Sequence, residues 1–477
     1  MGAGNGAAGN SAVASEQNQA GPDAANQPDD LAISDAKIDP RKPDIHPPTP
    51  TPIRTLAPTP RPVSPTNSTP LPWVGGRHGK SGPDAGPYGQ RGDSDIVRAN
   101  GGTRESEAAV ELGLAWLAKV QEKDGGWMLD PIQPAALHRP MPVPVRGRGN
   151  PWTNESIGAT GLATLAFLGA GYTHQDKGRY KETVDHALKW LLEKEDKDGK
   201  FPYTRFYEQG IATMVLCEAY GMTKDPLLRQ PAQKGIDFIL KNMGKSNVSV
   251  KDLASMQDRF NKIMQQMQSE KDPAKRMSLQ RELLDLRRQM GSQNEVEGGF
   301  GYTGPGNDVH VTSFQVMALK SARLAGLTVP EEAFAKLRGY YDNALAPNYL
   351  TNYRSGPGNG STPARAALGL FCRFFLGVGA KDPKLAKIAD VIAKTGPVID
   401  DVFQVYYGSY GMFQMGGEYW KNWNAAFRDA VVALQVKDPE DLRGSWNATG
   451  RSSGRVVATA IYIMALEVYY RFLPVNR

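Results

Sequence analysis

A window near the C-terminus gathers side chains that could contact an apolar ligand or stabilise a cation. It reads "DVFQVYYGSYGMFQMGGEYWKNW" over residues 401–423. Aromatic faces attract cations, and aromatic residues with methionines also suit an apolar cavity. Packing that seals one end of a domain would need no ligand, so both interpretations stay open. The candidate lining residues are Phe403, Tyr406, Tyr407, Tyr410, Phe413, Trp420 and Trp423.

Two loops add polar groups that could contact the same ligand. They read "GFGYTGPGNDVH" over residues 299–310 and "NYLTNYRSGPGNGST" over residues 348–362. Their glycines and prolines indicate turns between helices, so we expect both loops at the rim of one mouth. The candidate polar contacts there are Tyr302, Asp308, His310, Tyr353 and Arg354.

The residue types that bind metals are sparse in this chain. Cys217 and Cys372 are the only cysteines, and each lies inside an apolar run, "TMVLCEAY" and "LGLFCRFF". Buried free thiols are therefore expected rather than a disulfide. The 6 histidines are dispersed, without ligand spacing to a cysteine or to one another. We expect no metal site and no cofactor.

Composition divides the 477 residues into a tail and a folded part. Residues 1–95 are rich first in Gly, Ala and Asn and then in Pro and Thr, without apolar periodicity. Such a segment cannot bury enough surface to fold, so it is expected to be disordered, as a tether or as a dispensable tail. The remainder, with the whole chain 40% hydrophobic, can form a large core.

Charge and hydropathy exclude two classes of partner. The net charge is +6, but the basic residues are scattered and form no run with interleaved aromatics, so nucleic acid is not an expected partner. No stretch reaches the roughly 18 apolar residues of a membrane span, and the N-terminus lacks the pattern of a signal peptide. The sequence does not specify a compartment.

A motif of helix, glycine turn and aromatic residue repeats along the folded part. "VELGLAWLAKVQEKDGGW" (110–127) and "HALKWLLEKEDKDGKF" (186–201) agree at every offset. A third copy ends at Gly298 and Phe300, and a looser one at Gly444 and Trp446. The corresponding positions are Trp116 and Trp190, Gln121 and Glu195, Gly125 and Gly199, and Trp127 and Phe201.

Each copy is followed by a second helix of small and apolar residues, such as "GATGLATLAFLGAGY". The unit is therefore a helical hairpin, in which the aromatic residue after the glycine acts as a plug. A hairpin cannot cover its own apolar face and must stack on its neighbours. Spacing predicts about six hairpins over residues 105–475 and an all-α fold.

The motif from Gly113 to Trp127 resembles the QW repeat of squalene–hopene and oxidosqualene cyclases, and the unit is similar to that of protein prenyltransferase β subunits. This resemblance implies an α/α toroid, with inner helices around a central cavity and outer helices around them. It also implies that the glutamine caps helix ends and that the tryptophan braces neighbouring repeats. The implied structural residues are Trp116, Gln121, Trp127, Trp190, Phe201, Phe300 and Trp446.

The catalytic signatures of that superfamily are incomplete here. Cyclases protonate an alkene with Asp-x-Asp-Asp, and "VIDD" over residues 398–401 lacks the first acid. The resemblance makes Asp400 and Asp401 candidate acids, although a helix N-cap or a solvated loop would also explain them. The Asp-x-Cys pair of the prenyltransferase zinc site and the thioester sequence Cys-Gly-Glu-Gln are both absent.

An insertion over residues 249–291 interrupts the third repeat. Apolar residues recur every three or four positions on both sides of "KDP", which predicts an antiparallel helical hairpin. The two helices could simply cover each other, or a methionine-rich face could bind a protein partner. The expected seam consists of Leu253, Met256, Phe260, Ile263, Met267, Leu279, Leu283, Leu286 and Met290.

Two functions follow from these observations. The first is a non-catalytic binding or scaffold toroid, whose central cavity or inserted hairpin engages an apolar ligand, such as an isoprenoid, or a protein partner. The alternative is a divergent enzyme of the terpene cyclase or isomerase type that uses Asp400 as general acid. The depth and polarity of the ring's interior and the burial of Asp400 discriminate between them.

Overall fold

The structure, a computed structural model, describes residues 88–89, 91–129, 157–202, 205–245, 250–291, 296–356, 360–448 and 454–472. The chain divides into two compact units, Met1–Pro62 and Val63–Arg477, and every described residue belongs to the second. Most of the expected tether, residues 1–87, therefore lies outside the described residues. Ordered structure begins before residue 95, because Tyr88 and Arg91 are buried and helix α1 spans Ser94–Ala99.

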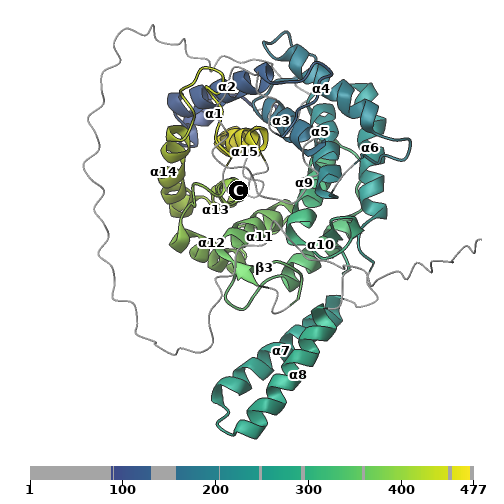
Figure 1. The fold of residues 1–477 in the computed structure, drawn as a ribbon, viewed down its shortest axis with the longest axis vertical. Coiled ribbons are helices and arrows are strands. Elements are labelled where there is room, and N and C mark those ends of the chain that lie inside the picture. Colours follow the sequence, from purple (N-terminus) through teal and green to yellow (C-terminus); the bar gives the residue numbers. More distant parts are fainter. Residues whose placement is uncertain are drawn as a thin grey trace, which may run out of the picture. The chain divides into compact units, whose positions relative to one another are not determined.

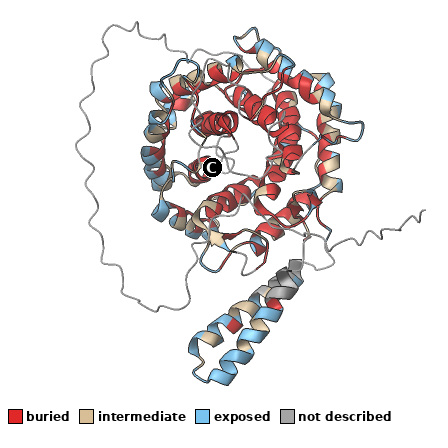
Figure 2. Cartoon of the chain, viewed as in Figure 1, coloured by how far each residue is buried: buried red, intermediate tan, exposed pale blue. Residues whose placement is uncertain are grey.

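In the described part of the second unit, six helices line the inside of a ring (Figure 1). Each packs against the next, and the last packs against the first, so the ring is closed. Figure 2 shows that these inner helices are buried along nearly their whole length. They are α3 (Ile157–Gly169), α5 (Tyr207–Thr223), α9 (Val309–Ala325), α11 (Pro363–Phe375), α13 (Val402–Met415) and α15 (Arg455–Leu466).

Six outer helices alternate with the inner ones along the chain and cover them. Each buries one apolar stripe; in α12, for example, the buried residues are Leu385, Ile388, Ala389 and Ile392. This confirms the expected all-α toroid of six hairpins. The outer helices are α2 (Arg104–Lys119), α4 (Lys181–Lys194), α6 (Pro226–Lys241), α10 (Glu331–Asn343), α12 (Pro383–Thr395) and α14 (Gly417–Ala433).

Small elements complete the described ring. Two antiparallel pairs of two-residue strands lie in the loops before α9 and α11, and a short helix ends the described chain. The pairs are β1 (Phe300–Gly301) with β2 (Gly304–Pro305), and β3 (Thr351–Asn352) with β4 (Ser361–Thr362); the short helix is α16 (Val468–Arg471).

The aromatic plugs are buried and join the two helices of one hairpin. Trp127 donates from its indole nitrogen to the Leu117 carbonyl at 2.8 Å, and its backbone N–H donates to Thr160 Oγ1 at 2.9 Å. The Trp446 indole likewise donates to the Val431 carbonyl at 2.8 Å, and its backbone N–H donates to a threonine of α15. The plug therefore fixes the outer helix and the inner helix of its own hairpin.

The glutamines before the first and the last plug, Gln121 and Gln435, join successive hairpins. Gln121 donates to the carbonyl of Gly125 in its own turn and to that of Thr183 on α4, at 2.9 and 3.0 Å. Gln435 donates to the carbonyls of Gly444 at 2.9 Å and Ala109 on α2 at 2.8 Å. The last hairpin thus binds the first by the same contact that joins neighbours in sequence, and this contact closes the ring.

At the Gln435 position, the second hairpin has Glu195. Its Oε1 is buried without a hydrogen-bond partner among the described residues. Burial raises the pKa of Glu195 to about 8, even though the positive charge of Lys234 opposes this shift. A carboxyl group that keeps its proton near neutral pH can donate a hydrogen bond as the glutamine amide does.

In four of the six hairpins, a glycine in the turn touches the next outer helix; the exception among these turn glycines is Gly396 of the α12–α13 hairpin, which has nothing within 4 Å of a built Cβ. Gly444 has φ +89°, and a Cβ built on it would lie 2.3 Å from the Leu112 carbonyl oxygen of α2. Gly125 and Gly199 also have positive φ, and a Cβ on either would lie within 2.4 Å of a backbone atom of the next outer helix. Only glycine permits both this conformation and this approach.

Gly444→Ala tests the closing contact, with Gly377→Ala as its matched control. Gly377 has φ +88° but has nothing within 4 Å of a built Cβ, so its variant adds only the strain of a left-handed alanine, about 1–2 kcal/mol. We expect Gly444→Ala to lower the free energy of unfolding by roughly 2 kcal/mol more than the control, because the backbones must also separate. Urea unfolding measures both; equal losses would contradict the closing contact.

The insertion forms helices α7 (Val250–Ser269) and α8 (Pro273–Gly291), which pack against each other. Ile263 and Leu286 are the buried centre of their seam, and Arg259 pairs with Glu282 at 2.6 Å. Other members of the expected seam, Met256, Phe260, Met267, Leu279 and Leu283, are partly buried around that centre; the side chains of Leu253 and Met290 lie outside the described set.

Candidate functional site

The two predicted loops meet at the N-terminal ends of α5, α9 and α11. Tyr353 donates from its hydroxyl to Asp308 Oδ2 at 2.5 Å, and its oxygen lies 3.1 Å from that of Tyr302. Asp308 is also the N-cap of α9, because its Oδ1 accepts from the backbone N–H of His310 at 2.8 Å and of Val311 at 3.0 Å. The structure therefore brings Tyr302, Asp308, His310 and Tyr353 together.

An arginine lies over the ring of each tyrosine. The Arg205 guanidinium lies 4.3 Å from the ring centroid of Tyr302, and that of Arg365 lies 5.7 Å from the centroid of Tyr353. Arg205, Tyr302, Tyr353 and Arg365 form the tyrosine row, in which both phenol rings are half-buried. Arg354, the fifth predicted polar contact, is half-buried and follows Tyr353 in the sequence.

The tyrosine row presents protonated hydroxyls. Burial raises the pKa of both Tyr302 and Tyr353, and the nearby Asp308 carboxylate raises them further. Neither phenol therefore ionises near neutral pH. Because the Tyr353 hydroxyl donates to Asp308, the Tyr302 hydroxyl donates to the Tyr353 oxygen, and the row offers a partner the Arg205 guanidinium and aromatic faces. The sequence analysis did not identify Arg205 and Arg365, which complete the row. The available signal was the position of Arg365, two residues after Pro363.

A hollow lies beside the β3–β4 pair, and its lining includes Asn352, the residue before Tyr353. Its volume is about 400 Å³. It is lined by Ala346, Pro347, Asn348, Asn352, Gly360 and Ser361. This lining contains no aromatic side chain and no member of the tyrosine row, so the hollow gives no separate support for a ligand.

The aromatic window on α13 lies in the layer between inner helices. Tyr406, Tyr407 and Tyr410 are buried, and Tyr410 donates to the Met464 carbonyl of α15 at 2.7 Å. Phe371 of α11 packs edge-on or tilted against all three tyrosines. Phe403 is half-buried and stacks on Tyr407 with a centroid separation of 6.4 Å. These positions match the packing interpretation of the window, and ligand contact remains a prediction.

The tryptophans of the window join α14 to its neighbours. Trp420 donates to the Asn100 carbonyl at 2.9 Å and packs edge-on against Phe413. Trp423 donates to Ser409 Oγ at 3.1 Å, and its indole covers Gly408 so closely that a Cβ there would lie 2.4 Å from it. Both indoles brace the outer helix against the inner one.

The candidate acids lie in the turn before α13. Asp400 is exposed, and Asp401 is the N-cap of α13, accepting from the Gln404 N–H at 3.0 Å. An acid that protonates an alkene must be held in a dry pocket. The position of Asp400 does not provide one, and capping accounts for Asp401.

A buried network of charges fills the ring near the opposite, C-terminal ends of the inner helices. Glu218 of α5 pairs with Arg91 at 2.8 Å and with Arg471 at 3.1 Å, and Arg471 also pairs with Glu467 at 2.9 Å. All four side chains are inaccessible to solvent. Sequence reasoning missed them, although each carboxylate lies in an otherwise apolar run.

The network holds a proton near neutral pH. Burial raises the pKa of Glu467 to about 8, since the opposing charge of Arg471 is shared with Glu218. Burial likewise raises the pKa of Glu107 to about 8, with added repulsion from Glu467. Neutral carboxyl groups at these positions avoid the cost of isolated buried anions.

Glu467→Gln tests this protonation. A carboxyl group that is protonated when folded but ionised when unfolded makes the folded state progressively less stable from about pH 5 to about pH 8. We therefore expect the variant's free energy of unfolding to fall less steeply over this range than that of the wild type. Exposed Glu105→Gln on α2 is the control and should follow the wild type. Urea titration at each pH measures the free energy of unfolding of all three proteins. A parallel fall in all three would contradict the assignment.

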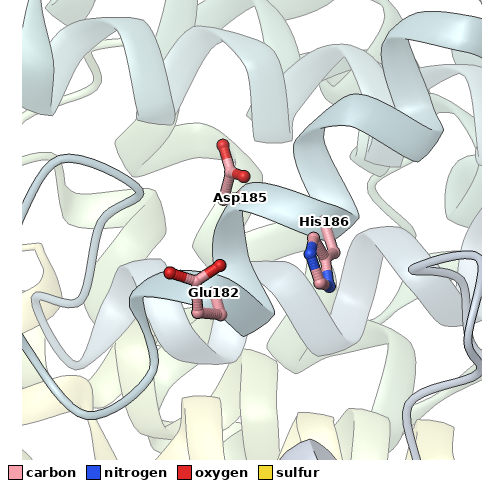
Figure 3. A group of neighbouring side chains, drawn as sticks. All are labelled: Glu182, Asp185 and His186. Carbon is pink, nitrogen blue, oxygen red and sulfur yellow. The ribbon is translucent and has the colours of Figure 1, made fainter.

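One group in the described residues has the composition of a metal site. Glu182, Asp185 and His186 lie on successive positions of one face of α4, with ligand atoms within 4.8 Å of one another (Figure 3). Lys189 already pairs with Asp185 at 2.7 Å, and the glutamate and histidine are exposed. Exposed groups of this kind are common without a metal, so we assign none.

None of the helices in the described ranges combines the length and the apolar character that a bilayer span requires.

Comparisons with known proteins give distant structural similarity only. No protein-family model matches the chain. No curated protein matches it either. Among solved structures, it is similar to cellobiose 2-epimerase from Spirochaeta thermophila, at 10% identity and a TM-score of 0.49, over 79% of this chain and 97% of that one.

Two further structures show the same level of similarity. An inactive variant of an alpha-1,6-mannanase from Salegentibacter has 9% identity and a TM-score of 0.47, over 77% of this chain and 98% of that one. A type II terpene cyclase from Scytonema has 11% identity and a TM-score of 0.44, over 76% of this chain and 98% of that one. The description of this chain as an α/α toroid rests on its own helix contacts.

Proposed function

We propose that this toroid is a scaffold that binds a protein partner through the tyrosine row. The observation that carries the proposal is the assembly of Arg205, Tyr302, Tyr353 and Arg365 from separate loops and a helix end into one row. The first three are partly exposed, whereas Arg365 is 5% exposed and supports the row by donating to backbone carbonyls of the loop before α11. Tyrosine and arginine are the residue types that dominate binding energy at protein interfaces. His310 and Phe403, both half-buried, extend the same rim.

The ring's interior supports a protein partner over an isoprenoid. An isoprenoid site would be apolar, whereas the buried charges of Glu218, Arg471 and Glu467 lie inside the ring. The alternative enzyme is not proposed, because Asp400 is exposed and so lacks the surroundings of an alkene-protonating acid.

The inserted hairpin is a second candidate surface for a protein partner. Met264, Met277 and Leu284 are 39%, 59% and 46% exposed, and they account for half of the large exposed apolar residues of the described chain. Met277 and Leu284 are seven residues apart on α8, so they share one helix face away from the seam. Exposed apolar side chains on one face are a feature of interaction surfaces.

Site-specific photo-crosslinking tests the tyrosine row. A benzoylphenylalanine residue replaces Tyr302 in the full chain, and a matched probe replaces the half-buried Tyr419 on α14. In cells, we expect a discrete protein adduct from position 302 and none from position 419. Adducts of the same protein from both positions would contradict a role for the row.

The double variant Tyr302→Ala with Tyr353→Ala then measures how much the tyrosine row contributes to binding the partner. Because each tyrosine at the centre of an interface can contribute about 2 kcal/mol, we expect the affinity for the crosslinked partner to fall at least tenfold. The thermal unfolding midpoint of the variant serves as the control for folding. Unchanged affinity in a folded variant would overturn the proposed function.

A further inference from the structure

A segment outside all six hairpins inserts into the ring at the end opposite the tyrosine row. Tyr88, 1% exposed, donates from its hydroxyl to the Ser321 carbonyl of α9 at 2.9 Å. Arg91, 4% exposed, donates to the Leu168 carbonyl of α3 at 3.0 Å and pairs with Glu218 of α5 at 2.8 Å. The two side chains therefore contact three inner helices, and neither takes part in the repeat contacts described above.

The site is built to take a cation beside a phenol. Leu168 lies in the last turn of α3, and helix C-termini carry a partial negative charge that adds to that of Glu218. The Arg91 guanidinium also lies 4.7 Å from the Tyr88 ring centroid, so the two side chains enter as one unit. Gly221 of α5 supports the tyrosine: a Cβ built on it would lie 2.3 Å from the Tyr88 ring.

We propose that this end of the ring is a receptor site for a protein turn that carries tyrosine and arginine three residues apart, and that the chain's own Tyr88 and Arg91, joined by a hydrogen bond from the Arg91 N–H to the Tyr88 carbonyl, occupy it in cis. A partner protein presenting the same two side chains would compete for it. The site is separate from the tyrosine row, so the proposal stands or falls independently of the proposed function.

The site can empty without leaving a bare buried charge. Glu218 retains Arg471 at 3.1 Å, and its Oε1 accepts from Ser321 Oγ at 3.2 Å, whether or not Arg91 is present. Burial alone would raise the pKa of Glu218, but Arg471 and Arg91 together hold it below its ordinary value. Removing one partner of an isolated buried pair is strongly destabilising, and the second arginine lessens that cost here.

One donor of the arginine is left unsatisfied. Nη1 donates to the Leu168 carbonyl and Nη2 lies 2.8 Å from Glu218, but Nε has no hydrogen-bond partner among the described residues. Release into water would satisfy that donor, which offsets part of the cost of exchanging the segment.

A peptide-binding experiment on the full chain tests the receptor site. The probe is a fluorescent peptide of residues 86–93, GPYGQRGD. The variant Tyr88→Ala with Arg91→Ala empties the site, and we expect it to bind the peptide at least tenfold more tightly than the wild type does. The same peptide with its arginine replaced by alanine is the control and should not bind. A folded variant that binds neither peptide would overturn the proposal.

Gly221→Ala, added to the same variant, places a methyl group where the peptide's tyrosine ring must lie. Gly221 lies inside α5, where alanine is favoured over glycine by about 1 kcal/mol, so the ring should remain folded. We expect this change to abolish peptide binding. Binding that persists would show that the peptide is held elsewhere and would overturn the proposal.

Hydrogen exchange on the wild-type chain covers the case in which the emptied variant does not fold. The proposed segment leaves its site while the ring stays folded. We therefore expect the amide hydrogens of residues 88–92 to exchange with solvent at least a hundredfold faster than those in the middle of α5. Exchange of both regions at the same rate, only through global unfolding, would overturn the proposal.

Discussion

The contact between a glycine turn and the next outer helix is the constraint on which the ring depends. At Gly125 and Gly444 the backbone has positive φ and approaches the following helix so closely that a side chain is excluded. Gln121 and Gln435 then bind the two hairpins together through backbone carbonyls. The glycine contact recurs at four of the six junctions, including the one between the last hairpin and the first, where it closes the ring.

The inner helices run in the same direction, which gives the ring two chemically different ends. The N-termini of α5 and α9 lie at one end, where Tyr302 and Tyr353 meet at the Asp308 cap. The opposite end carries helix carbonyls and Glu218, and it attracts arginines. Both proposed binding sites follow from this polarity: the first uses donors and aromatic faces that project from loops, and the second uses the negative ends of the helices themselves.

The sequence predicts the ring better than it predicts the sites. Offsets between Trp116 and Trp127 recur because each repeat must make the same contact, so periodicity alone identifies hairpins. Aromatic clustering on α13 is a weaker guide, because an inner helix of a closed ring has neighbours on both sides and Tyr407 packs there without a ligand. Arg91 was assigned to the tether because nothing local in its sequence marks burial; its partner Glu218 lies far along the chain.

Zero-length carbodiimide crosslinking tests ring closure most directly. Lys119 at the end of α2 and Asp441 in the last plug turn are both about half exposed, and their Nζ and Oδ1 atoms lie 3.6 Å apart. A closed ring predicts an intramolecular amide between these two residues in the monomer, detected by mass spectrometry of the digested protein. Helical hairpins stacked as an open rod would place the first and last repeats far apart, and the absence of this crosslink in the folded monomer would contradict the account.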